Sequence, residues 1–179
     1  MACGSASENS SCVGTKTIQL TDEEKKNNRM ILLKVLLDNG FSCVAASGVV
    51  GNIMGESGGN PTAYNSCDGV ECTPSVGICQ WHGSRYTRLN DFANKQGKPW
   101  NDMELQAQFM IWEFNNTHKE AAKKIKEQTT PEDAAIACCI FYEVAAHCHN
   151  PWKTNGKWDC SKNRKQAAQE MYQKCTNQQ

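Results

Sequence analysis

The 179-residue sequence lacks any apolar run close to the roughly 20 residues that a bilayer-spanning helix needs, so it predicts no membrane span. It also lacks a net charge, because 19 basic residues balance 19 acidic ones. Nucleic-acid-binding proteins usually carry a basic stripe, so this balance argues against a nucleic-acid partner. Residues 1–11 are small and polar and lack the apolar core of an intact secretory signal.

Motifs for metal and cofactor chemistry are absent as well. The sequence has no glycine-rich phosphate loop, no nucleophile elbow and no His-Glu-x-x-His pattern. His147, Cys148 and His149, with Cys160 and His118, form a cluster of metal-ligand types, but their spacing matches no closed zinc pattern. We expect a disulfide at Cys148 beside two loop histidines, and neither a metal nor a cofactor.

Cysteine, in contrast, is abundant, with 11 residues in the chain. Such a density favours a disulfide-permissive environment, and the odd number leaves at least one thiol free or paired between chains. Closeness in sequence suggests the pairs Cys3–Cys12, Cys67–Cys72 and Cys148–Cys160. The alternative is that several cysteines, such as Cys138 and Cys139, are small core residues of a reduced protein.

The length suits one domain with a sizeable core. Residues 1–17 are predicted to be a flexible leader without periodicity, and residues 18–179 a single domain. Helix signals recur along the domain: N-caps at Thr21, Ser42, Ser84, Asn101 or Asp102, Thr130 and Ser161, and a charged helix at 118–128. We expect the apolar helix after Thr130, with Phe141 in the core, to be the central one. Residues 58–83, rich in Gly, Pro, Asn and Ser, predict a functional loop with a short hairpin near Val76–Trp81.

The sharpest chemical feature is the segment from Gly55 to Pro61, Gly-Glu-Ser-Gly-Gly-Asn-Pro. It sets Glu56 at the C-terminal end of an apolar helix, beside the negative end of the helix dipole and the apolar Ile53 and Met54. Both neighbours oppose ionisation, and a protonated carboxyl group can donate to a glycosidic oxygen. The alternative is a solvated glutamate at a helix end.

Residues 46–61 and the segment from Gly77 to Arg85 (Gly-Ile-Cys-Gln-Trp-His-Gly-Ser-Arg) together resemble the phage tail lysozyme family. This family is related to goose-type lysozymes and soluble lytic transglycosylases. The family has four motifs in a fixed order: a Glu-Ser turn, an Asn-Pro shortly after it, a Gly-x-x-Gln-Trp segment and a later Tyr-Glu pair. This sequence matches all four in that order, and the resemblance covers roughly residues 25–150. The resemblance implies a mostly α (α+β, lysozyme-like) fold: a helical domain with a small irregular or β lobe and a central buried helix.

The resemblance implies that Glu56 is the general acid and that Ser57, Gln80, Trp81 and Tyr142 contact the substrate. A Trp is often buried, so Trp81 is alternatively a core aromatic. A second carboxylate would lie about 5–5.5 Å from the acid in a retaining enzyme and about 6.5–9.5 Å away in an inverting one. The candidates are Asp68, which goose-type relatives favour, Glu143, Glu71 and Asp91. Without one, the acetamido group of the substrate would assist, as in a lytic transglycosylase.

The implied function is cleavage of the β-1,4 bond between N-acetylmuramic acid and N-acetylglucosamine in bacterial peptidoglycan. The expected location is extracellular or virion-associated, with other virion tail proteins as partners if the chain is phage-borne. Two alternatives remain open: a catalytically silent glycan-binding tail component, and a peptidase using Cys79 near His82. The departures from the family pattern are the cysteines, including Cys79 within the Gln-Trp motif and the Cys67–Cys72 insert.

Overall fold

A computed structural model describes residues 17–68, 73–144 and 160–177. The predictions that concern Glu71, Cys72, residues 147–149 and most of the leader lie outside these residues. The described elements, in chain order, are α1 (Asp22–Asp38), α2 (Cys43–Glu56), β1 (Tyr64–Asp68), β2 (Thr73–Val76), β3 (Trp81–His82), α3 (Gly83–Gln96), α4 (Met103–Asn115), α5 (Lys119–Lys126), α6 (Pro131–Cys138), the π-helix η1 (Cys139–Glu143) and α7 (Cys160–Thr176). No helix within the described ranges is long and apolar enough to cross a membrane.

The helix starts follow the local capping signals. Thr21 forms the expected capping box with Glu24, and the side chains of Ser42, Asp102 and Thr130 accept hydrogen bonds from the first turns of α2, α4 and α6. The segment predicted to begin at Ser84 instead begins at Gly83, after His82, which makes no side-chain capping bond. These short-range signals therefore set the helical framework, which is mostly α as expected.

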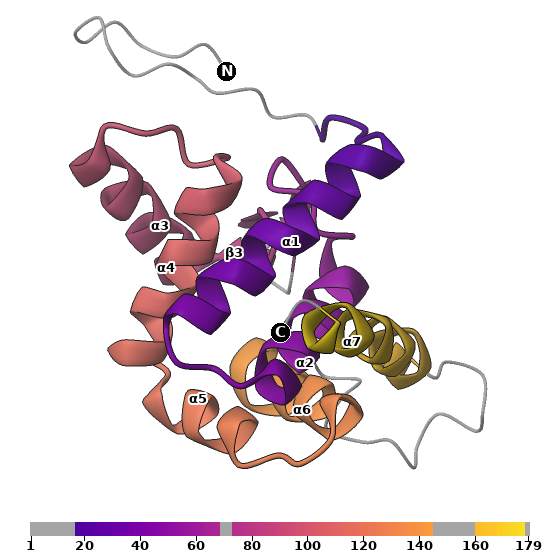
Figure 1. Cartoon of the computed structure of the whole chain (residues 1–179). Helices are drawn as coiled ribbons and strands as arrows, with labels where there is room; N and C mark the ends of the chain where they lie inside the picture. The colour runs from indigo at the N-terminus through magenta and orange to yellow at the C-terminus, as the bar shows by residue number, and fades with distance from the viewer. Residues whose placement is uncertain (1–16, 69–72, 145–159, 178–179) are drawn as a thin grey trace, which may run out of the picture.

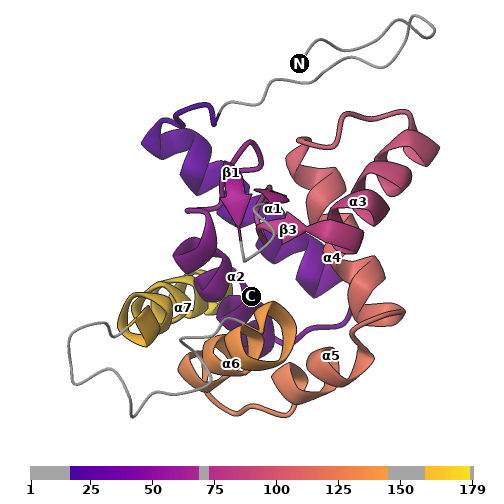
Figure 2. The ribbon, with the colours of Figure 1, turned by 180° about the vertical axis from the view of Figure 1, so that it is seen from behind.

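Helix α2 is the central helix, and α6 and α7 pack against it on neighbouring sides (Figures 1 and 2). The prediction that placed the helix after Thr130 at the centre is wrong in this respect, although α6 is itself largely buried. Small residues on α2 permit the close approach: a Cβ on Gly48 would lie 2.3 Å from the Cβ of Ala134, and one on Gly51 would lie 2.6 Å from that of Ala168. Substitution of either glycine would therefore push a neighbouring helix away from α2.

The predicted irregular lobe is a three-stranded antiparallel sheet in the order β1–β2–β3. Tyr64 pairs with Val76, and Val76 pairs in turn with Trp81. The ladder between β1 and β2 is irregular between Asn65 and Asp68. The sheet lies between α2 and α3 in the chain, so it carries the segment that links Glu56 to the Gln80-Trp81 motif (Figure 2).

The end of the α6 region corrects another expectation. Phe141 was predicted to be a core residue, but its side chain is 45% exposed, whereas Tyr142 is fully buried. The cause is the π-helix η1, whose i→i+5 hydrogen bonds turn the chain less per residue than an α-helix does. The α-helical periodicity is thereby broken, and Tyr142 and Glu143, not Phe141, turn toward the interior.

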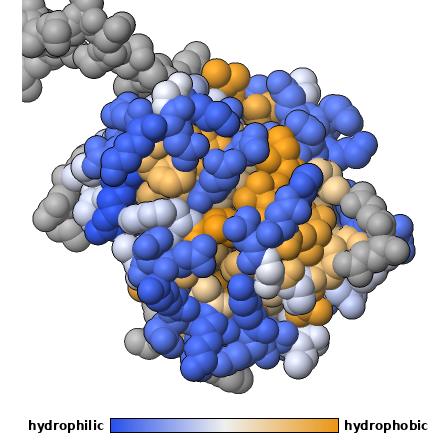
Figure 3. Space-filling view, turned by 60° about the vertical axis from the view of Figure 1, so that its left-hand side comes forward, coloured by the Kyte–Doolittle hydropathy of each residue, from blue (hydrophilic) through white to orange (hydrophobic). Residues whose placement is uncertain are grey.

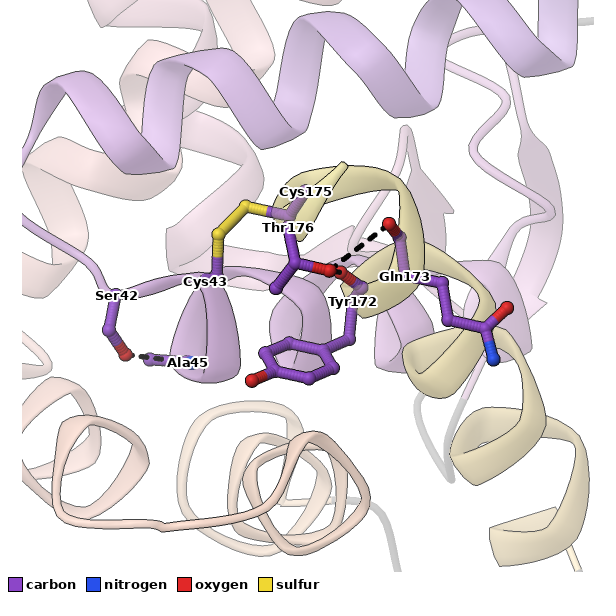
Figure 4. The surroundings of a disulfide bond; sticks show 7 residues. All are labelled: Ser42, Cys43, Ala45, Tyr172, Gln173, Cys175 and Thr176. Carbon is purple, nitrogen blue, oxygen red and sulfur yellow. Dashed lines mark hydrogen bonds between the residues drawn. A yellow bond between two sulfur atoms is a disulfide. The ribbon is translucent and has the colours of Figure 1, made fainter. Parts of the chain in front are cut away.

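A disulfide joins Cys43 at the start of α2 to Cys175 near the end of α7, across 132 residues (Figure 4). This pair was not among those suggested by closeness in sequence. Cys67 and Cys139 are also disulfide-bonded, whereas Cys79 and Cys138 are buried free thiols. The interpretation of Cys139 as a reduced core residue is therefore wrong, and that of Cys138 as a buried thiol is confirmed.

The Cys43–Cys175 bond closes a loop of 132 residues. We therefore expect its removal to destabilise the fold mainly by increasing the conformational entropy of the unfolded chain. Replacing both cysteines with alanine should lower the free energy of unfolding by about 2–4 kcal/mol. Urea unfolding under oxidising conditions measures the effect. Cys138→Ala, which removes no cross-link, serves as the control, and equal stabilities of the double variant and wild type would contradict the prediction.

Candidate active site

Glu56 is the last residue of α2, and its side chain is 16% exposed. Its Oε1 accepts a hydrogen bond from Nη2 of Arg164, which lies on α7 and is itself almost completely buried. The Nε of the same guanidinium donates to Oδ1 of Asn52, one turn earlier on α2, at 2.9 Å. Arg164 is thus held by two side chains of α2 and fixes the direction of the Glu56 carboxyl group.

A glycine makes this contact possible. A Cβ on Gly55 would lie 2.8 Å from Cγ and 2.9 Å from Cζ of Arg164, so a larger residue would displace the guanidinium. Sequence reasoning missed Arg164, because 108 residues separate it from Glu56. The one signal available was a cationic residue on the apolar side of the terminal helix, four positions before Ala168.

The turn after Glu56 is tied to the sheet lobe. The Oγ of Ser57 donates to the carbonyl oxygen of Ile78 at 2.9 Å and accepts from the backbone N–H of Gly59 at 3.2 Å. Gly58 and Gly59 both have positive φ angles, 65° and 72°, a conformation that favours glycine. The hydroxyl predicted to contact the substrate therefore joins the turn after Glu56 to the loop before Gln80.

Gln80 is held in a conformation that is uncommon for a residue with a side chain, with φ of 47°. Its Nε2 donates to the carbonyl of Gly77 at 3.0 Å, and its Oε1 accepts from the hydroxyl of Ser75 at 3.1 Å. Both bonds are local and hold the amide over the β2–β3 turn. Backbone outliers of this kind cluster at active sites and ligand-binding loops.

Gln106, a fully buried residue of α4, joins the loop before Gln80 to two other segments through three hydrogen bonds. Its Oε1 accepts from the N–H of Ile78, and its Nε2 donates to the carbonyls of Pro61 and Trp100, all at 2.9 Å. A Cβ on Gly77 would lie 2.7 Å from Oε1 of Gln106, so a glycine is needed there. Gln106 could not be recognised from the sequence, because a buried glutamine in an apolar helix has no distinctive local pattern.

Trp81 and Tyr142 both lie in the core with no exposed surface. The Nε1 of Trp81 and the hydroxyl of Tyr142 donate to Oε2 of Glu113, at 2.8 and 2.6 Å. Arg85 adds two further bonds to the same carboxylate, each 2.8 Å long, and its guanidinium lies 4.6 Å from the centre of the Tyr142 ring. For Trp81 this is the alternative core position considered above, and Tyr142, which was expected to contact the substrate, likewise has no exposed surface.

Burial of Glu113 opposes its ionisation, but the hydrogen bonds and charge of Arg85 and the donors of Tyr142 and Trp81 outweigh it, so its pKa is lowered. The network therefore consists of a buried carboxylate and a buried guanidinium with matched donors. Sequence reasoning missed Glu113, which belongs to no pattern that can be read along the chain. It assigned no role to Arg85, although Arg85 ends the segment from Gly77 to Arg85 that carries the resemblance.

Glu143 follows Tyr142 at the end of η1. Burial raises its pKa to about 8, and the negative charge of Glu56 contributes to the rise. Its Oε1 is buried and has no hydrogen-bond partner within the described part of the chain. Glu143 is therefore a carboxyl group that stays neutral at neutral pH, and it lies close enough to Glu56 for the charge of Glu56 to raise its pKa.

The remaining candidates lie elsewhere. Asp68 is at the end of β1, the tip of the sheet lobe. Asp91 is exposed on α3 and lines a groove that does not include Glu56. Cys79 is 2% exposed, and burial raises its pKa, so the thiolate that a cysteine peptidase needs is disfavoured. Over the described ranges, no three His, Cys, Asp or Glu side chains are grouped to hold a metal ion.

A mostly helical domain that ends its central helix on a glutamate, next to a small antiparallel sheet, has the architecture of lysozyme-like proteins. The chain belongs to the phage tail lysozyme family, whose model matches residues 27–175. It is similar to morphogenesis protein 1 of Bacillus phage B103, with 26% identity over 147 residues. The match covers 76% of this chain but 39% of the phage protein, so the chain spans about two fifths of the length of that relative.

Proposed function

We propose that this protein is a muramidase that cleaves the β-1,4 bond between N-acetylmuramic acid and N-acetylglucosamine in peptidoglycan. The observation that carries the proposal is the Glu56 carboxyl group, oriented by Arg164 at the end of the central helix of a phage tail lysozyme domain. A protein that only binds glycan has no need for a carboxyl group held in this way.

In the proposed reaction Glu56 is the general acid. Arg164 occupies Oε1, so Oε2 is the oxygen that carries the proton. The proton passes to the glycosidic oxygen as the bond between that oxygen and the anomeric carbon breaks, and the bonding electrons leave with the oxygen. Glu56 is left as a carboxylate opposite the charge of Arg164, and an oxocarbenium-like centre remains on the sugar.

The neutral form of Glu143 argues against it as the base or nucleophile that completes the reaction at neutral pH. A protonated carboxyl group has no charge to activate water, but it donates a hydrogen bond, for example to a substrate acetamido oxygen. We therefore assign Glu143 to substrate positioning. Asp68, at the tip of β1, is our candidate for the second carboxylate of a hydrolase. Without such a carboxylate, the substrate acetamido group would assist and the enzyme would be a lytic transglycosylase.

The protonation of Glu143 predicts a pH-dependent stability. In the folded protein the pKa of Glu143 is raised to about 8, whereas its ordinary pKa, which applies to the unfolded chain, is 4.5. Between these values the folded state binds more protons than the unfolded chain, so stability falls as the pH rises. Glu143→Gln removes this dependence, and we expect its advantage over wild type to grow by up to about 1.4 kcal/mol per pH unit across that window. Urea unfolding at pH 5, 6.5 and 8 measures it, and a constant difference would contradict the prediction.

Digestion of purified peptidoglycan, with products resolved by mass spectrometry, tests the function itself. Release of muropeptides with reducing ends would indicate a hydrolase, and 1,6-anhydro ends a transglycosylase. Asp68→Asn should abolish release if Asp68 is the second carboxylate and should have little effect in a transglycosylase. Failure of the folded wild type to release products from several wall chemotypes would leave the glycan-binding tail component as the better account.

The relationship to a phage morphogenesis protein supports a virion-associated location. We propose that the chain acts on the bacterial wall from the tail of a phage particle, alongside other tail proteins. The Cys43–Cys175 bond is compatible with this site of action, because structural disulfides persist outside the reducing cytosol.

A further inference from the structure

A groove with a volume of about 340 Å³ lies between α3 and α4 and shares no residue with the Glu56 site. Its apolar floor is formed by Phe92, Phe109 and Trp112. The rings of Phe109 and Trp112 stack with centres 5.7 Å apart and planes inclined by 11°, and Phe92 lies against both. Since Phe109 is fully buried and Trp112 half-buried, the outer part of the indole and the Phe92 ring are the surfaces that a ligand would meet.

The rim of this α3–α4 groove is polar and of mixed charge. Arg88, Asp91, Lys95 and Gln96 all come from α3, at helical spacing along one side of the groove. Arg88 makes a 3.3 Å hydrogen bond to Ser84, whereas no ion pair or hydrogen bond within the described part of the chain engages the side chains of Asp91 and Lys95. The rim thus presents two cations, one carboxylate and one amide around an aromatic floor.

This combination fits a saccharide better than an apolar protein segment. A pyranose ring has an apolar C–H face, which packs on an aromatic ring, and hydroxyl or acetamido groups at its edge, which need both donors and acceptors. The two rim cations also match the carboxylates that the peptide stems of peptidoglycan carry. An apolar partner would leave the four polar rim groups desolvated without partners.

We propose that the α3–α4 groove is a second glycan-binding site, which holds N-acetylated sugars of the wall outside the catalytic site. The inference rests on the proposed function for the identity of the glycan. The role of this second site is to keep the protein bound to the wall. Because the chain has no net charge to attract it to the wall, sugar contacts in the groove supply affinity for insoluble peptidoglycan. Figure 3 shows the side of the molecule that carries α3 and α4, where apolar patches are bordered by hydrophilic side chains.

The test compares binding to insoluble peptidoglycan sacculi in a Glu56→Gln background, so that cleavage does not interfere. The groove variant is Asp91→Ala with Lys95→Ala, and the matched control is Asn94→Ala, an exposed substitution on the same helix that does not line the groove. We expect the groove variant to bind sacculi three- to tenfold more weakly than the control. Titration with N-acetylglucosamine tetramer, followed by the indole N–H signals in NMR spectra, should perturb the signal that Trp112→Phe removes.

Cleavage is measured separately, with the same groove substitutions in the wild-type Glu56 background. On soluble glycan fragments their rate should equal that of wild type, while the rate on sacculi falls with binding. Sacculus binding equal to the control, or a tetramer titration that leaves the Trp112 signal unchanged, would overturn the second site. Absence of cleavage with normal groove binding would instead refute the muramidase proposal and support the groove.

Discussion

Glu56→Gln should reduce the release of muropeptides from purified peptidoglycan at least a hundredfold, in line with the 10²–10⁴-fold that general acid catalysis typically contributes. The glutamine of this variant would keep the size of the side chain and an oxygen that can accept from Arg164, but it has no proton of suitable acidity for the leaving oxygen. The rate of product release at saturating substrate, followed by mass spectrometry, measures the loss. Activity within tenfold of wild type would remove Glu56 from the role of acid.

The control for this variant is Glu120→Gln, which makes the same chemical change on the exposed face of α5 and should retain wild-type activity. The folding of Glu56→Gln has to be verified as well, because Arg164 is buried and loses its counter-charge. An unchanged near-ultraviolet circular dichroism spectrum would show that the loss of activity is chemical. Arg164→Lys, which keeps the cation but not its two-sided contact with Asn52 and Glu56, should give an intermediate rate.

Glu113→Gln should destabilise the protein by about 3–5 kcal/mol, the usual range when one partner of a buried ion pair is removed. Glu113 has no exposed surface, and the guanidinium of Arg85, with 18% side-chain exposure, depends on it for charge compensation. An amide in place of the carboxylate also offers only one acceptor oxygen to the donors of Trp81, Arg85 and Tyr142. Urea unfolding at neutral pH measures the change in the free energy of unfolding.

The double variant Glu113→Gln with Arg85→Met identifies the cause of this destabilisation. If the uncompensated charge of Arg85 dominates, removing it should recover part of the stability lost in Glu113→Gln. The exposed substitution Glu120→Gln again serves as the control and should change stability by less than about 0.5 kcal/mol. A Glu113→Gln protein as stable as that control would show that the buried network contributes little to the fold.

The helical framework and the location of the candidate acid could be predicted from the sequence because their causes are local. The side chains of Thr21, Ser42 and Thr130 accept hydrogen bonds from backbone N–H groups three residues later. Each N-cap can therefore be recognised from four consecutive residues of the sequence. The glycines after Glu56 end α2 through their own φ angles. A loop with a short hairpin was likewise expected from the turn residues of 58–83, and the resemblance implied an irregular or β lobe, although the three-stranded register was not predicted.

The supporting structure of the site depends on residues that are distant in sequence. Arg164 reaches Glu56 across 108 residues, Glu113 collects donors from three other segments, and Cys43 bonds to Cys175 across 132 residues. Helical periodicity placed Phe141 in the core, but the π-helix exposed Phe141 and buried Tyr142. By itself the sequence determined where most of the helices begin and which carboxyl group terminates α2, because those outcomes depend on interactions within one turn. Only the tertiary structure decided which charges that carboxyl group meets and which aromatic rings are buried, because packing brings together groups that no local pattern relates.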